Sequence, residues 1–345
     1  MMKEKELTIY DLANHLGISA ATVSRALQDH PAVSQKTKKK IMDLAAKMGY
    51  RSNKFASNLR KQRSNTIGVI VPRLNSLFIS SVLSGMERIL NDANYNLIIG
   101  QSLEQEAREK VNAITMFNSR VDALVVSLAA DTQDMSHFAR FTKRKIPILF
   151  FDRTTDAVPA TRIMIDNFSA GYKATTHLIE QGCKKIVHLT GNLLRDVYKD
   201  RFDGYKAALD DNGLLYNPEL LISNDMSEFS VREAFVNYIR KSDTMPDGLF
   251  AANDTSAAFV LTVLKENGLS APDDIAIVGF NNDLTSRITD PQITTINYPG
   301  IEMGQNIARI LLSQIEGDGL EHYTNTVILS SDLLIRPSSM RKVGI

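Results

Sequence analysis

Three polar residues stand where apolar, strand-like runs end. Asp152 closes the run PILFFD, Asn253 follows GLFAA, and Asn281 follows IAIVGF. If these runs are parallel strands, their carboxyl ends form the edge at which open α/β sheets bind ligands. Amide and carboxylate groups at that edge, with the aromatic Phe78 after the first run, suit a polyhydroxylated ligand such as a sugar or a nucleoside.

Two arginines accompany these residues. Arg195 and Arg201 flank the start of the predicted helix RFDGYKAAL. Guanidinium groups bind carboxylates and phosphates, so two arginines among few carboxylates favour an acidic or phosphorylated sugar. Plainer interpretations stay open: Asp152 can cap a turn, Arg195 can be a surface charge, and Asn253 can cap the next helix.

No catalytic, metal or cofactor site is predicted. The six histidines lack the spacing of metal ligands, and there is neither a Walker loop nor a nucleophile elbow. The single cysteine, Cys183, excludes an intrachain disulfide and is typical of a reducing compartment. The N-terminus lacks the apolar core of a signal peptide, and no apolar run is long enough to span a membrane. We therefore expect a cytoplasmic protein.

Residues 8–27 predict two short helices joined by a tight turn. Gly17 suits the backbone conformation of that turn, and Thr8 and Ser19 are N-caps, with Asp11 completing a box with Thr8. The second helix would expose small and polar side chains that can reach base edges: Ala20, Ala21, Thr22, Ser24 and Arg25. The alternative is a capped helical pair without a role in DNA binding.

A basic third helix and a basic linker follow. Ser34 caps a helix ending near Lys47, which carries Lys36, Lys38, Lys39 and Lys40. Ten apolar residues supply a three-helix core: Leu12, Leu16, Ile18, Val23, Leu27, Val33, Ile41, Leu44, Ala45 and Met48. The linker contains a candidate helix, 53–59, with Asn53 as its N-cap and Leu59 on one face. A solvated tether is the alternative.

Charge separates this head from the rest of the chain. Residues 1–65 contain 13 Lys and Arg against 5 Asp and Glu, whereas the whole chain of 345 residues has a net charge of only +1. A basic head on an acidic body indicates a nucleic-acid-binding unit attached to another domain.

The body reads as two α/β series. Apolar runs at 67–72, 96–100, 123–128 and 147–152, then at 185–191, 219–223, 248–253 and 275–280, alternate with helices predicted at 81–93, 107–118, 170–181, 255–266 and 301–315. Continuous apolar strands between helices indicate parallel sheets covered on both faces. We expect a head at 1–50, a linker at 51–65, and a body at 66–345. Its first lobe is about 66–163 and 293–325, and its second about 164–292 and 326–345.

The phrases TIYDLANHLGISAATVSRAL, VSQKTKKKIMDLAAKMGY and NKFASNLR closely resemble the lactose/galactose repressor family of bacterial transcription regulators. The resemblance extends through the body in IGVIVP, GYKATTHLIEQG, RFDGY, AANDTSAA and IVGFNND. It implies a helix-turn-helix head on a periplasmic-binding-protein-like body of two doubly wound lobes. It further implies a homodimer that binds near-palindromic operator DNA, with no membrane partner.

The resemblance also implies residue roles. The second helix would lie in the major groove, with Ala20 and Ala21 at the positions that distinguish operators. Residues 53–59 would be the family's hinge helix, in which Ala56 and Ser57 allow close approach and Leu59 is wedged between base pairs. Arg201 matches the effector-binding arginine, and Asn253 and Asn281 match positions that bind ligand hydroxyls. The family commonly has aspartate at position 281, which puts the usual carboxylate–diol contact in doubt. Two rivals remain open: a free sugar-binding receptor, and an enzyme on the same two-lobed fold.

Overall fold

The computed structural model describes residues 7–27, 29–50, 63–241, 244–317 and 324–341. The chain divides into two compact units, residues 1–64 and 65–345. None of the described helices is both long and apolar enough to cross a lipid bilayer.

The first unit contains three helices, α1 (Ile9–Leu16), α2 (Ala20–Leu27) and α3 (Gln35–Met48). Their ends confirm the predicted caps. The Asp11 carboxylate accepts hydrogen bonds from the backbone N–H and the hydroxyl of Thr8, both at 2.7 Å. Gly17 ends α1 with φ of 65°, a left-handed conformation that favours glycine. Ser19 accepts from the Thr22 N–H at 3.1 Å and so caps α2.

The ten predicted core residues of the head all lie in its apolar cluster. Ala13 and Ala26 are also fully or nearly fully buried there, and Ile9, Ala20 and Tyr50 pack at its edge. Ala13 and Ala26 were not among the predicted core residues, because a small side chain gives a weak apolar signal in the helical pattern. The head is therefore a small, self-contained core.

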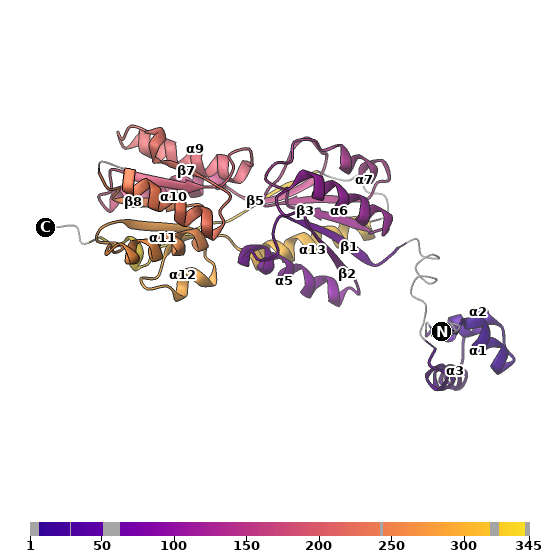
Figure 1. Cartoon of the computed structure of the whole chain (residues 1–345). Coiled ribbons are helices and arrows are strands. Elements are labelled where there is room, and N and C mark those ends of the chain that lie inside the picture. Colours follow the sequence, from indigo (N-terminus) through magenta and orange to yellow (C-terminus); the bar gives the residue numbers. More distant parts are fainter. Residues whose placement is uncertain (1–6, 28, 51–62, 242–243, 318–323, 342–345) are drawn as a thin grey trace, which may run out of the picture. The chain divides into compact units, whose positions relative to one another are not determined.

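The second unit is built on two six-stranded sheets (Figure 1). The first has the order β11-β5-β4-β3-β1-β2 and the second the order β12-β10-β9-β8-β6-β7. The strands of the first sheet are β1 (Thr66–Val71), β2 (Asn96–Gln101), β3 (Ala123–Val126), β4 (Ile148–Phe151), β5 (Thr161–Ile165) and β11 (Thr326–Leu329). Those of the second are β6 (Ile186–Thr190), β7 (Leu221–Ser223), β8 (Gly248–Ala251), β9 (Ala276–Asn281), β10 (Thr294–Asn297) and β12 (Leu333–Leu334).

Helices lie between these strands in the chain. The first lobe carries α5 (Leu77–Asp92), α6 (Glu106–Asn118), α7 (Ala139–Lys143) and α13 (Gly300–Glu316). The second carries α8 (Asn167–Glu180), α9 (Asp196–Asp211), α10 (Glu228–Lys241), α11 (Asp254–Glu266) and α12 (Leu284–Ile288). Strands β3, β4 and β8 are buried along their whole length. Their uninterrupted apolar runs had predicted this, because both faces of a parallel sheet are covered by helices.

The predicted lobe boundaries need correction. Residues 161–165 form β5 of the first sheet, and residues 294–297 form β10 of the second. The chain therefore returns to the first lobe after Asn297, rather than at 293, and leaves it after Leu329, rather than at 325. These short strands are defined by pairing with distant partners, such as Ile328 with Met164, which local patterning does not reveal.

Glycines let one pair of helices in each lobe pack closely. A Cβ on Gly304 of α13 would lie 2.0 Å from the Val82 carbonyl oxygen of α5. A Cβ on Gly204 of α9 would lie 2.1 Å from the Phe168 carbonyl oxygen of α8. Gly171 of α8 faces the backbone of Arg201 in the same way, at 2.3 Å. This contact fixes the position of the Arg201 backbone.

Candidate functional site: a DNA-binding head and a polar lobe interface

Helix α2 presents only part of the surface predicted for it. Ala21 and Arg25 are exposed, and Thr22 and Ser24 are half-buried, with the Thr22 hydroxyl 2.8 Å from that of Ser19. Ala20 is also half-buried and packs against the edge of the head core. Ala21 and Arg25 are thus the most exposed of the five predicted residues.

Lys38 is one of the four lysines of the basic third helix, but it does not face solvent. Its side chain is buried, with 5% of the residue exposed, and its ammonium group donates to Asp29 Oδ1 at 2.6 Å and to the Asp29 carbonyl at 2.9 Å. Lys36, Lys39 and Lys40 are exposed. The predicted hinge residues Asn53, Ala56, Ser57 and Leu59 lie outside the described residues.

Arg201 lies inside the second lobe. It projects from α9 with 3% of its surface exposed. Its guanidinium donates to Asn167 Oδ1 and to the Ala252 carbonyl, both at 2.9 Å, and lies 3.6 Å from the centre of the Phe280 ring. Helices α8 and α9 and strands β8 and β9 therefore all determine where this charge lies.

Phe78, Asp152 and Arg201 meet around Tyr298. The Phe78 ring stacks on the Tyr298 ring with centroids 4.2 Å apart, and the Tyr298 hydroxyl donates to Asp152 Oδ1 at 3.1 Å. The guanidinium carbon of Arg201 is 5.9 Å from the Tyr298 ring. Ser76 caps α5, so Phe78 lies in the first turn of this helix and not in a preceding loop. The structure thus joins three predicted site residues from two lobes.

Asn253 and Asn281 lie next to this group. Asn253 accepts a hydrogen bond from the Ser256 N–H at 2.7 Å, as the N-cap of α11, and directly follows the Ala252 carbonyl that binds Arg201. The Asn281 carbonyl accepts from the Tyr298 N–H at 3.4 Å. The capping role anticipated for Asn253 is therefore present in the structure.

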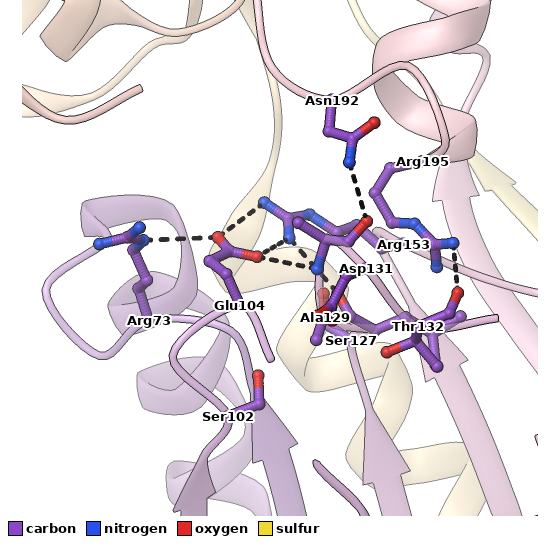
Figure 2. Close-up of polar contacts among 12 residues, drawn as sticks. Arg73, Ser102, Glu104, Ser127, Ala129, Asp131, Thr132, Arg153, Asn192 and Arg195 are labelled. Carbon is purple, nitrogen blue, oxygen red and sulfur yellow. Dashed lines mark hydrogen bonds and ion pairs between the residues drawn. The ribbon is translucent and has the colours of Figure 1, made fainter. Parts of the chain in front are cut away.

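Arg195 reaches from the start of α9 to the first lobe. Its guanidinium donates to the Thr132 carbonyl at 2.6 Å, and Asn192 donates to the Ala130 carbonyl at 3.4 Å (Figure 2). Glutamates hold this loop of the first lobe: Glu109 accepts from the Ala129 N–H at 2.7 Å, and Glu104 from the Ala130 N–H at 3.1 Å. Arg195 is therefore a buried interface residue and not a surface charge.

Arg153, which follows Asp152, spans the interface. It donates to Glu104 at 2.5 and 3.2 Å and to the Tyr198 hydroxyl of the second lobe at 3.1 Å. Figure 2 shows Arg73 on the other side of Glu104, with its Nε 3.5 Å from the carboxylate. Thr154 adds a second link, because Asp196 accepts from its N–H at 2.9 Å and its hydroxyl at 2.8 Å.

Burial controls the ionisation of the central groups. It raises the pKa of the Asp152 carboxyl, against the opposing effects of Arg153 and Arg201. It lowers the pKa of Arg201 below its ordinary value and raises that of Tyr298. A charge at this interface is therefore stabilised mainly by other charges and by hydrogen bonds, because water is largely excluded.

Sequence reasoning missed Arg153, Tyr198 and Tyr298. Arg153 could have been found, since it directly follows a residue already assigned to a strand end. Tyr198 lies one helical turn before Arg201 and could have been placed on the same face of α9. Tyr298 gives no local signal, because it lies where the chain passes from β10 to α13. Within the described ranges, no group of three metal-binding side chains is present.

Comparisons with known protein families match the head and the body separately. Residues 8–53 match bacterial regulatory proteins of the lacI family, and residues 175–339 match the periplasmic binding protein-like domain. The transcriptional regulator RegA of Clostridium saccharobutylicum is 29% identical over 96% of this chain and 99% of its own length. Catabolite control protein A of Priestia megaterium is 29% identical over 88% of this chain and 91% of its own.

Solved structures share the fold. The lac repressor dimer bound to operator and the anti-inducer ONPF superposes with a TM-score of 0.86 and 23% identity, over 98% of this chain and all of that one. A LacI family transcriptional regulator from Enterococcus faecium with bound ribose has a TM-score of 0.71 and 26% identity, over 79% of this chain and 98% of its own.

Proposed function

Because the chain belongs to the lacI family of bacterial regulatory proteins and is a DNA-binding transcription regulator, we propose that it acts as a repressor. It binds a near-palindromic operator as a homodimer and responds to a sugar-like effector held between its lobes. Since its target is chromosomal DNA, it works in the cytoplasm. No enzymatic role is proposed, because the matched relatives are transcription regulators.

The observation that carries the effector site is the meeting of Phe78, Asp152 and Arg201 at Tyr298. It combines an aromatic surface with a carboxylate and a guanidinium at the carboxyl ends of strands, as sugar binding requires. The bound ribose of the Enterococcus faecium regulator supports a ligand of this class. Side chains of the two lobes contact each other directly here, so the effector enters when the lobes separate. Its binding then changes their relative position and the operator affinity.

Residues 53–59 are proposed to couple effector binding in the body to operator binding by the head. A helix of seven residues is too short to persist alone in water, so it would form on the operator beside its symmetry mate. Leu59 would be inserted between base pairs, and Leu59→Ala should weaken specific operator binding without weakening effector binding. Equal operator affinity in wild type and variant would contradict this role.

A salt-dependent gel shift on the DNA upstream of the protein's own gene tests operator binding. We expect a specific complex that survives near physiological salt and that Arg25→Ala weakens. Arg140→Ala provides the matched control, because Arg140 is an exposed arginine of the first lobe. Loss of the specific complex in the wild type under these conditions would contradict the proposal.

A further inference from the structure

We infer that Lys38 is a positioning residue for operator binding. Through Asp29 it holds the end of α2 in the geometry from which Arg25 contacts DNA, and it makes no contact with DNA itself. The inference rests on the proposed function, since operator binding is the property that Lys38 affects. It begins from the turn in which α2 ends.

Helix α2 ends in a turn closed by two backbone hydrogen bonds. The Asp29 N–H donates to the Ala26 carbonyl at 3.1 Å. The His30 N–H donates to the Arg25 carbonyl at 2.9 Å. This pattern is the Schellman motif, in which the residue just after the helix has a left-handed conformation and is usually glycine. Here that residue is Asp29, with φ of 54°, so the last turn of α2 depends on an aspartate in a conformation that favours glycine.

Lys38 of α3 holds this aspartate at two points. Its ammonium group donates to the Asp29 carboxylate at 2.6 Å and to the Asp29 carbonyl at 2.9 Å. The lysine side chain is only 6% exposed, whereas that of Asp29 is 76% exposed. Charge-assisted bonds to the side chain and to the backbone of one residue restrict its orientation more than a single bond does. The pair therefore ties the end of α2 to α3, and both helices pack on the same apolar core.

Burial separates Lys38 from the other lysines in the first half of α3. Lys36, Lys39 and Lys40 are exposed, so their ammonium groups can approach DNA phosphates. The ammonium group of Lys38 is enclosed and already bound to two acceptors. A lysine that neutralises a phosphate releases counterions, so its removal lowers the salt dependence of binding. Removal of a positioning lysine leaves that salt dependence unchanged, and this difference makes the two roles measurable.

The test compares the full-length protein on operator DNA and on non-specific DNA over a range of salt concentrations. The variant combines Asp29→Asn with Lys38→Met, which removes the ion pair without changing the net charge. We expect its operator affinity to fall roughly tenfold, as the loss of a charge-assisted bond predicts. Its non-specific affinity and salt dependence should stay as in wild type. Retained non-specific binding also shows that the head is folded.

Two further variants serve as controls. Lys39→Met combined with Asp43→Asn removes the same charges at two exposed residues of α3. It should leave the ratio of operator affinity to non-specific affinity unchanged, because a phosphate contact contributes to both. Lys38→Arg should retain most of the operator affinity, since a guanidinium group can still donate to both acceptors of Asp29.

A double-mutant cycle tests whether the pair acts through Arg25. If it does, the pair variant added to Arg25→Ala should weaken operator binding less than about twofold further, because the contact that it positions is already lost. Additive losses would overturn the inference, since they would show that the pair supports operator binding independently of Arg25.

The inference is also overturned if the pair variant binds the operator as wild type does, or if it loses operator and non-specific binding equally with a lower salt dependence. If the pair variant loses all DNA binding, Asp29→Asn alone is the test, since that side chain is largely exposed, and it must lose operator affinity selectively. Failure of the regulator proposal gives a different result, namely no specific complex in the wild type.

Discussion

Arg201 shows how one side chain can depend on four elements. Its guanidinium makes two hydrogen bonds at 2.9 Å and lies over the Phe280 ring, an arrangement that needs a planar group with several donors. Lysine keeps the charge but cannot make both bonds and stack on the ring. We expect Arg201→Lys to weaken effector binding at least about tenfold in a calorimetric titration. The control is Arg140→Lys, and an unchanged titration for Arg201→Lys would contradict the assigned role.

Asp254 predicts a pH dependence of stability. It is fully buried, its Oδ2 accepts from the Asp283 N–H at 2.7 Å, and burial raises its pKa to about 7. A carboxyl group whose pKa is raised on folding stabilises the native state while protonated. That contribution is complete at pH below the unfolded pKa and is lost as the pH rises through about 7.

The matching variant is Asp254→Asn. It should lessen the fall in the free energy of unfolding between about pH 4 and pH 7, by up to about 4 kcal/mol. Urea unfolding at several pH values measures this, with the exposed Asp273→Asn as control. Asp283, whose pKa burial raises to about 6, adds a dependence of the same sign, so some slope should remain. An unaltered slope in Asp254→Asn would show that another group is responsible.

At the scale of elements, the packing of α8 against α9 holds the binding arginine in place. A Cβ on Gly171 would lie 2.3 Å from the Arg201 carbonyl oxygen, and backbone cannot yield as a side chain can. We expect Gly171→Ala to destabilise the protein by about 3 kcal/mol and to weaken effector binding. The control Gly213→Ala meets no atom within 4 Å but has φ of 69°, so it should cost only about 1 kcal/mol. Thermal unfolding and ligand titration of both variants distinguish a steric clash with the Arg201 backbone, expected for Gly171→Ala, from backbone strain alone, expected for Gly213→Ala.

The elements that could be predicted from the sequence are those with local causes. The box of Thr8 and Asp11, the turn at Gly17 and the cap at Asn253 each depend on residues within three positions of one another. The features that the sequence did not predict depend on contacts with residues farther along the chain. Strand β5 is defined by its neighbours β4 and β11, and the burial of Lys38 by a loop aspartate nine residues earlier.

The same division holds for the site. The strand ends and a helix start were enough to name Arg201, Asp152 and Phe78 as site residues. They did not predict that Tyr298 would contact Asp152 and Phe78. Nor could the sequence distinguish a buried Arg195 from an exposed one, since its acceptor is a carbonyl of the other lobe. Residue types predict the chemistry of a site, whereas the crossing of the chain between lobes decides which residues meet.

At the scale of the whole molecule, we expect two copies to associate through the surface of the first lobe. Large apolar side chains are exposed on the edge strand β2 and the adjoining helix α6: Ile98, Ile99, Val111 and Ile114. An edge strand beside exposed apolar residues favours contact with another chain. We therefore expect the homodimer to form at this surface, so that two heads are available for the two halves of a near-palindromic operator.

A single added charge on this surface tests whether the dimer forms there. Val111 is 62% exposed and lies one helical turn from Ile114, so Val111→Glu should leave the fold intact. A carboxylate buried at the dimer contact should raise the dimer dissociation constant more than about tenfold, as analytical ultracentrifugation would measure. Operator affinity should fall with it, because each head alone contacts half of the site. Leu215→Glu, at a residue 94% exposed in the second lobe, is the control. A Val111→Glu protein that remains dimeric would place the dimer interface elsewhere.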